Sequence, residues 1–129
     1  MSMDPKESNT TASPPSTSTT LAEMQQWVDR FAEERKWERF HTPKNLAMSI
    51  AIEAAEIMEL FQWSESTPLD GPLPPDCALA EEMADVVSYL LRLASVTGID
   101  LSAALQAKIQ KNEIRYPVRT DYEFPSTER

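Results

Sequence analysis

The chain has 129 residues, of which 41% are hydrophobic, and its formal net charge is −9. This length predicts one domain, and the negative charge argues against a nucleic-acid polymer as partner, because such binding needs a basic surface. No apolar run in the sequence is long enough to span a bilayer, so we expect no membrane partner either.

The first twenty residues differ in composition from the rest of the chain. They are rich in Ser, Thr and Pro and contain no large aliphatic residue, so they cannot bury enough apolar surface to offset the entropy lost on ordering. We therefore expect a disordered tail over residues 1–20. It lacks Arg and carries Asp4 and Glu7, which argues against an organellar transit peptide. Cys77 is the only cysteine, which favours a reducing compartment; we expect the cytoplasm, with or without the nucleus.

The rest of the chain has the composition of a helical protein. Only two glycines occur, while Leu, Ala, Glu and Met are frequent, which favours helix over sheet. Thr42 before Pro43 is a typical helix start, and Gly98 is a typical helix end. Asp100 or Ser102 is suited to cap the last helix. We expect four helices, over about residues 22–36, 43–63, 76–96 and 100–116.

The second and third of these segments are apolar around most of their circumference. A helix of this kind is buried on all sides within its own chain, or is buried against a second subunit. About a hundred ordered residues make only a modest core. The sequence therefore predicts an all-α helical bundle that forms oligomers through these helices.

Four carboxylates interrupt the apolar helices at helical spacing. Glu53 and Glu56 are three residues apart on the second segment, and Glu82 and Asp85 repeat this spacing on the third. Residues so spaced lie on one face of a helix about a turn apart, where like charges repel. Moving a carboxylate from water into apolar surroundings also costs desolvation free energy, on the order of several kcal/mol.

A divalent cation would remove both costs. No Lys or Arg occurs between residues 44 and 92, so the acids have no local cationic partner. Oxygen ligands alone favour Mg²⁺, with Mn²⁺ as a substitute. Zinc and di-iron sites are disfavoured, because the only histidine is His41 and the only cysteine is Cys77. The alternative is an ordinary solvated acidic face, and the spacing alone does not decide between the two.

These motifs resemble those of a known family. Glu53-Ala-Ala-Glu56 followed by Glu82-Met-Ala-Asp85 is similar to the ExxE…ExxD signature of the MazG-like all-α nucleoside triphosphate pyrophosphohydrolases. The segments WERFH, LFQW and KNEIRYP are similar to the dCTP pyrophosphatase branch. The similarity covers residues 21–118, which we take as the helical domain, and leaves residues 119–129 as a flexible tail. The resemblance implies a helical core that assembles into a homotetramer, built as a pair of dimers with active sites between chains.

The resemblance also implies roles for ten residues. The metal ligands would be Glu53, Glu56, Glu82 and Asp85; the nucleobase and sugar would contact Trp37, His41, Trp63 and Tyr89; and the phosphates would contact Lys108 and Asn112, from a neighbouring subunit. The chain departs from the animal enzymes at Val28, where those carry a further histidine.

The patterns of the residues themselves agree in part with these roles. Tyr89 follows Asp85 by four residues, which places it on the same helix face as the acids. Trp37 and Trp63 flank the second helix, where they could stack on a base or simply pack into the core. Lys108 and Asn112 form a stripe with Arg115 or Tyr116 that suits phosphate oxygens.

The expected reaction is Mg²⁺-dependent hydrolysis of dCTP, and of modified dCTP, to dCMP and pyrophosphate, which would sanitise the nucleotide pool. Glu53 or Glu56 would orient or deprotonate the attacking water. Two alternatives stay open at this point. One is a pyrophosphatase of broader (d)NTP specificity, and the other is a non-catalytic helical assembly module.

Overall fold

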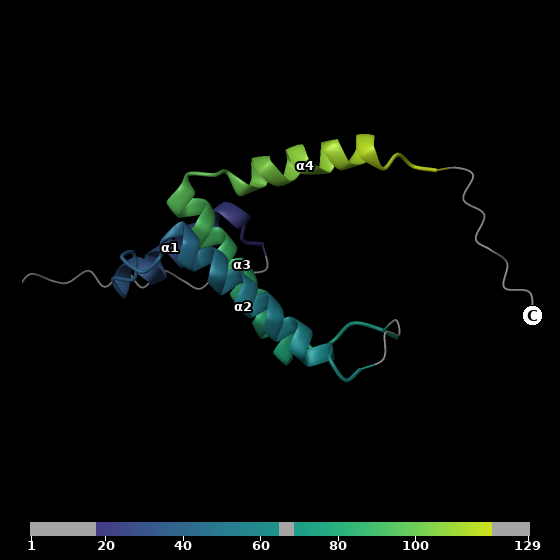
Figure 1. Ribbon diagram of the computed structural model, residues 1–129, viewed down its shortest axis with the longest axis horizontal. Helices are drawn as coiled ribbons and strands as arrows, with labels where there is room; N and C mark the ends of the chain where they lie inside the picture. Colours follow the sequence, from purple (N-terminus) through teal and green to yellow (C-terminus); the bar gives the residue numbers. More distant parts are fainter. Residues whose placement is uncertain (1–17, 65–68, 120–129) are drawn as a thin grey trace, which may run out of the picture.

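The computed structural model describes residues 18–64 and 69–119. Within these residues the chain forms four α-helices and no strand (Figure 1). The helices are α1 (Leu21–Glu34), α2 (Pro43–Phe61), α3 (Ala78–Thr97) and α4 (Leu101–Arg115). The predicted all-α class is confirmed. Residues 1–17 and 120–129, which make up most of the two expected tails, lie outside the described residues.

The ends of the helices follow from capping residues. Thr42 accepts a hydrogen bond from the Asn45 backbone N–H at 3.2 Å, with Pro43 at the first helical position of α2. Asp100, rather than Ser102, caps α4 by accepting from the Ala103 N–H at 3.0 Å. Gly98 ends α3 with a φ of 68°, a left-handed conformation that favours glycine. The helix expected from about residue 76 begins at Ala78, after Cys77.

The helices pack as a three-helix core with one projecting arm. α2 and α3 lie along each other, and α1 packs against one end of α3. α4 leaves α3 at a bend of 104° and extends away from the other three helices (Figure 1). The most deeply buried apolar side chains are where α1, α2 and α3 meet: Ala32, Leu46, Leu91 and Ala94.

Much apolar surface is left uncovered by this arrangement. The expectation that the second and third helices are buried on all sides within one chain is wrong, because α2 has only α3 to contact along most of its length. Met58 on α2 is 73% exposed and Met83 on α3 is 53% exposed. α4 has no buried residue, and its Ile114 is 84% exposed. Burial against a second subunit, the other expectation, stays open.

Among the described residues, no single helix is long and apolar enough to cross a membrane. Within residues 18–64 and 69–119, only the bent pair of α3 and α4 taken together is long and apolar enough, by length and composition alone.

Candidate active site

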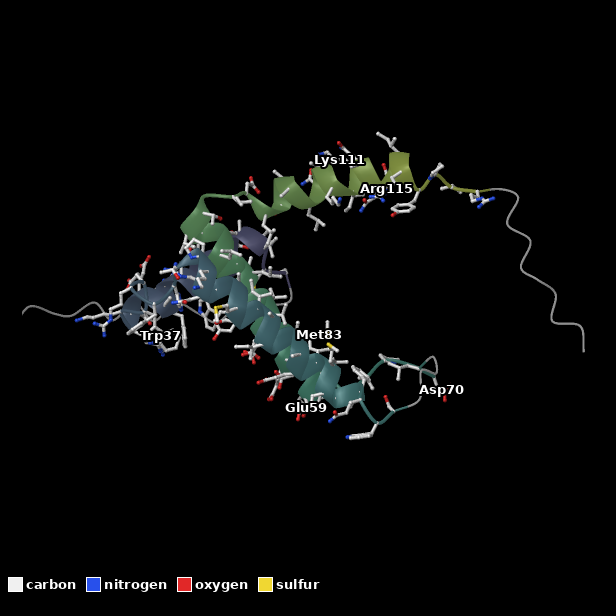
Figure 2. All side chains as sticks on the ribbon, in the orientation of Figure 1. Trp37, Glu59, Asp70, Met83, Lys111 and Arg115 are labelled. Carbon is white, nitrogen blue, oxygen red and sulfur yellow. The ribbon has the colours of Figure 1, made fainter. Side chains whose placement is uncertain are left out.

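Three of the predicted metal ligands meet where α2 lies along α3. One carboxylate oxygen from each of Glu53, Glu82 and Asp85 lies within 4.8 Å of the other two. Glu53 comes from α2, and the other two come from successive turns of α3. Figure 2 shows the carboxylate oxygens gathered along one side of the α2–α3 pair, with Glu59 towards the far end of α2. The packing of two helices thus converts two separate sequence motifs into one acidic cluster.

Glu56 completes the acidic cluster through its effect on the neighbouring acids. The pKa of Glu82 is raised to about 7, first by a side-chain hydrogen bond with Glu56, then by burial and by the charges of the other acids. The pKa of Glu53 is also raised, first by burial and then by the charges of Glu56 and Asp85. We use the term acidic cluster for these four residues. Glu81 and Glu59, the neighbouring glutamates, are exposed and lie outside it.

The acidic cluster fits a divalent metal ion. Oε2 of Glu53 and Oε2 of Glu82 are shielded from solvent and have no hydrogen-bond partner within residues 18–64 and 69–119. An acceptor that loses water without gaining another partner is unfavourable, and more so when it carries charge. The oxygens that converge here are all carboxylate oxygens, the donors that hard divalent cations prefer. A bound cation would neutralise the mutual repulsion of these acids, which contributes to the raised pKa of Glu82 after the Glu56 hydrogen bond and burial, and to that of Glu53 after burial.

An aromatic cavity of about 330 Å³ lies next to the acidic cluster. It lies between α1, the segment 35–42 and α3, and Asp85 belongs both to its wall and to the acidic cluster. The other lining residues are Trp27, Val28, Phe31, Ala32, Trp37, His41, Ser88, Tyr89 and Arg92. This size and this mostly apolar wall with a few polar groups are typical of a small-molecule site.

Aromatic contacts shape the wall of this cavity. The ring centroids of Trp27 and Phe31 are 6.5 Å apart, and those of Phe31 and Trp37 are 5.6 Å apart in an edge-to-face arrangement. The centroids of Trp37 and His41 are 6.0 Å apart. Edge-to-face pairs at such distances are favourable beyond the area that they bury. The wall is therefore a connected aromatic surface rather than a set of isolated rings.

The segment between α1 and α2 positions two of the predicted pocket residues. Lys36 has a φ of 55°, which turns the chain back after α1. The Trp37 N–H then donates to the Ala32 carbonyl at 3.0 Å, and the His41 N–H donates to the Trp37 carbonyl at 3.1 Å. The Asn45 side chain also donates to the Phe40 carbonyl at 3.0 Å. These bonds hold Trp37 and His41 in place without regular secondary structure.

A second cavity, of about 300 Å³, shares part of its lining with the first. Trp37, His41 and Tyr89 line both cavities. The second cavity is completed by Phe40, Asn45, Leu46 and Ser49. The two cavities therefore adjoin at these three side chains, and Asp85 lines the first cavity only.

The structure brings together some of the predicted site residues and separates the rest. Asp85 links the acidic cluster to the cavity that Trp37, His41 and Tyr89 line. Trp63 is 91% exposed and follows α2, whose nineteen residues separate it from Trp37 by about 28 Å along the helix axis. Figure 2 shows Trp37 and Glu59 towards opposite ends of the molecule's core.

The two predicted phosphate-contacting residues also lie away from the acidic cluster. Lys108 and Asn112 are on α4, and neither lines either of the two cavities. Figure 2 shows the neighbouring Lys111 and Arg115 on the same projecting arm. One chain therefore holds the acids and the aromatic cavity, but not the whole set of residues that the sequence predicts.

Comparison with known proteins assigns the family. A model of the MazG-like family matches residues 48–127. The chain belongs to the MazG-like family. It is 41% identical over 102 residues to dCTP pyrophosphatase 1 of Mus musculus, with 77% of this chain and 60% of that protein covered. It is 39% identical over 116 residues to dCTP pyrophosphatase 1 of Bos taurus, with 85% and 69% covered.

A solved structure supports the same assignment. The MazG-like chain matches a crystal structure of a pyrophosphatase from Archaeoglobus fulgidus with a TM-score of 0.68 and 37% identity, covering 82% of this chain and all of that one. The predicted resemblance to the dCTP pyrophosphatase branch is confirmed. The chain spans 60% of the length of the mouse relative.

Sequence reasoning missed a polar network behind the MazG-like site. Arg92 is only 7% exposed, and its Nε donates to Nδ1 of His41 at 2.9 Å. Its Nη1 donates to Asp29 on α1 at 2.8 Å. A signal for Arg92 was present, because it follows Asp85 and Tyr89 by helical spacing and ends a long segment without any cation.

The cavity wall from α1 was also missed. Trp27 and Phe31 are four residues apart on α1, a spacing that places both on one face. Val28 lies on the cavity wall too. The α1 face that contributes to the cavity is therefore apolar and aromatic.

Proposed function

We propose that this MazG-like protein is a divalent-cation-dependent nucleotide pyrophosphohydrolase that converts dCTP to dCMP and pyrophosphate. The observation that carries the proposal is the position of Asp85, which belongs to both the acidic cluster and the aromatic cavity. A nucleoside in the cavity would thus present its phosphates to the acids. The names of the animal relatives supply the substrate dCTP. We include modified dCTP as a second proposed substrate of the same kind.

The acidic cluster is the proposed site of Mg²⁺, with Mn²⁺ as a substitute. Glu53, Glu56, Glu82 and Asp85 would hold it through carboxylate oxygens alone. When bound, the cation supplies charge neutralisation for the triphosphate and for the developing negative charge. The pKa of Glu82 is raised to about 7 first by the side-chain hydrogen bond with Glu56, then by burial and by the charges of the other acids, and a cation would relieve the part that comes from those charges.

The chain's own acids would also move the proton. Water attacks the α-phosphorus, a new P–O bond forms, and the bond from that phosphorus to the bridging oxygen breaks. Glu53 or Glu56 takes the proton of the attacking water, and pyrophosphate leaves with the electron pair of the broken bond. Both glutamates lie on α2 within the acidic cluster, one turn apart.

The aromatic cavity would hold the base and the sugar. Stacking of a base on an aromatic ring contributes about 1–3 kcal/mol. Trp37, His41 and Tyr89 line the cavity, together with Trp27 and Phe31 from α1. A nucleoside bound against these rings would displace water from the side of Asp85 that faces the cavity, which would strengthen the electrostatic interactions there.

The active unit would be a homotetramer. Lys108 and Asn112 lie on the α4 arm, remote from the cavity of their own chain. Large apolar side chains are exposed on α2, α3 and α4, among them Met58, Met83 and Ile109, and such surfaces mark protein interfaces. A neighbouring subunit would cover them, and its Lys108 and Asn112 would reach the phosphates. Trp63 would enter the base pocket in the same way.

A panel of nucleotides tests this function. Pyrophosphate release would be measured for dCTP, modified dCTP and the other (d)NTPs, with Mg²⁺ and with a chelator. The proposal predicts release from dCTP that requires the cation. Equal release from all bases would favour a broad (d)NTP pyrophosphatase, and no release from any nucleotide would favour an assembly module.

A further inference from the structure

A chain of polar contacts runs from α1 to the wall of the aromatic cavity. The Gln25 side chain donates to the Ser95 hydroxyl at 2.7 Å, and Ser95 Oγ donates to Asp29 Oδ2 at 2.6 Å. Asp29 Oδ1 accepts from Arg92 at 2.8 Å, and Arg92 Nε donates to His41 Nδ1 at 2.9 Å. Only the last residue of this chain, His41, lines both cavities.

The contact between Arg92 and His41 fixes the protonation of the imidazole. A guanidinium can only donate hydrogen bonds, and it is never deprotonated in proteins. Nδ1 of His41 must therefore be the acceptor, without a proton of its own. A neutral imidazole with a bare Nδ1 carries its proton on Nε2. The doubly protonated ring cannot make this contact at all.

We propose that Arg92 is a positioning residue that holds His41 as the neutral Nε2–H tautomer, whose N–H donates to an acceptor oxygen of the bound nucleotide. The donation rests on the proposed function, whereas the tautomer rests on the contact alone. Because Nδ1 is occupied, Nε2 is the only ring nitrogen that His41 can offer to a ligand in either cavity.

Asp29 gives the arrangement its rigidity. The side chain of Arg92 is 8% exposed and that of Asp29 is 25% exposed, so their ion pair is shielded from solvent, and breaking such a pair leaves a charge uncompensated. Asp29 and His41 accept hydrogen bonds from different nitrogens of one planar guanidinium. The bond to Asp29 therefore sets the direction of the bond to His41. Ser95 and Gln25 orient the carboxylate in turn.

The charges around His41 agree with a neutral ring. Burial lowers the pKa of His41, and the nearby charge of Arg92 lowers it further, while Glu38 acts in the opposite direction. A neutral donor suits a neutral acceptor such as a carbonyl or a sugar oxygen. The network thus keeps a hydrogen-bond donor available over the neutral pH range without adding charge to the cavity wall.

The tautomer can be observed directly, because His41 is the only histidine in the chain. Long-range ¹H–¹⁵N correlation spectra of the full chain at neutral pH distinguish the two tautomers by the pattern of ring cross-peaks. We expect the wild type to show the Nε2–H pattern. Arg92→Met removes the donor, and Asp29→Asn loosens its anchor, so both should give a mixture of tautomers. Arg30→Met, at an exposed neighbour of Asp29 on α1, is the matched control and should keep the wild-type pattern.

Ligand contact is tested without turnover by adding dCMP. Its binding should shift the Nε2 proton signal of the wild type and should leave the tautomer unchanged. In steady-state assays with dCTP and Mg²⁺, Asp29→Asn and Arg92→Met should raise KM about tenfold, the loss expected for one hydrogen bond, with kcat changed less than about threefold. Arg30→Met should match the wild type.

Three results would overturn the proposal. The first is an Nδ1–H tautomer, or a mixture of tautomers, in the wild type. This result does not depend on whether the variants fold. The second is variants that lose thermal stability but keep both the tautomer and KM, which would make Arg92 purely structural. The third is an Nε2 signal that dCMP leaves unmoved although dCTP is hydrolysed. Absence of dCTP hydrolysis with the Nε2–H pattern present would overturn the proposed function and the donation, while upholding the tautomer.

Discussion

Glu53 on α2 and Glu82 on α3 face each other across the helix pair, and each turns one carboxylate oxygen away from solvent with no hydrogen-bond partner in the described residues. Apolar helices bring these oxygens together, although the acids repel each other. A protein has no stability reason to keep such a pair, because apolar residues in both places would avoid the cost. The pair is best explained by a ligand of positive charge.

The acids are the first target for mutation. Glu56→Gln or Asp85→Asn should abolish hydrolysis, with a loss of about a hundredfold or more, because each removes a charge from the acidic cluster. Circular dichroism should show unchanged helix content. Glu59→Gln, at an exposed glutamate three residues beyond Glu56, is the matched control and should keep activity. Retained turnover in either cluster variant would remove these acids from the mechanism.

The pH dependence of stability follows from the raised pKa of Glu82. Folding moves this pKa from 4.5 to about 7, so the fold favours the protonated form. Its contribution to stability is complete below pH 4.5 and is lost as the pH rises through about 7. In a chelator, Tm should therefore fall between pH 5 and pH 8, and Glu82→Gln should flatten that fall. A wild-type Tm that rises over this range would contradict the raised pKa.

The same titration gives a signature for the metal. A cation takes the place of the proton on the acidic cluster, so its binding is stronger when the acids are ionised. Mg²⁺ should raise Tm more at pH 8 than at pH 5. The measurement is a thermal melt at the two pH values with and without Mg²⁺. An equal increase at both values would indicate that the ion binds elsewhere.

The two tryptophans that flank α2 should behave differently in a single chain and in the assembly. Trp37 lines the cavity of its own chain, so Trp37→Ala should raise KM for dCTP by roughly 5- to 150-fold, the equivalent of about 1–3 kcal/mol of stacking. Trp63→Ala should also raise KM more than it lowers kcat, provided that the assembled protein is assayed. An unchanged KM in Trp63→Ala would show that Trp63 does not contact the substrate, and would leave packing at the subunit interface as its role.

Local spacing in the sequence predicted the helices and the two pairs of acids, whereas the meeting of the two pairs depends on how α2 packs against α3. Glu53 and Glu56 are three residues apart, as are Glu82 and Asp85, and caps such as Asp100 act within one turn. The cavity was harder to predict, because it depends on how α1 crosses α3. Nothing in the sequence around Asp29 indicates that its partner is Arg92, 63 residues further along.

The α4 arm was the least predictable from local patterns. The residue pattern of this segment predicted a helix. It did not predict the direction of the helix, which is set by the bend between α3 and α4. Lys108 and Asn112 lie on this arm, so the proposed phosphate contacts would require a second chain. The exposed apolar side chains of α2 pose the same problem. Their pattern predicts that they are buried, but it does not identify the surface that covers them.

A complementation experiment tests the contribution of a second chain. Lys108→Ala and Glu56→Gln proteins should each be inactive alone. If each site takes Glu56 from one chain and Lys108 from another, about a quarter of the sites in the co-expressed mixture should be intact under random assembly. Recovery of activity is the expected result. Inactive mixtures of confirmed mixed oligomers would place both residues in the same chain's site.

The most direct test of the central claim is the position of oxygen transfer. Hydrolysis of dCTP in ¹⁸O-labelled water with Mg²⁺, followed by mass spectrometry of both products, reports which phosphorus the water attacks. Attack at the α-phosphorus beside the acidic cluster predicts one labelled oxygen in dCMP and none in pyrophosphate. Label in pyrophosphate or in free phosphate, or no Mg²⁺-dependent turnover at all, would contradict the account.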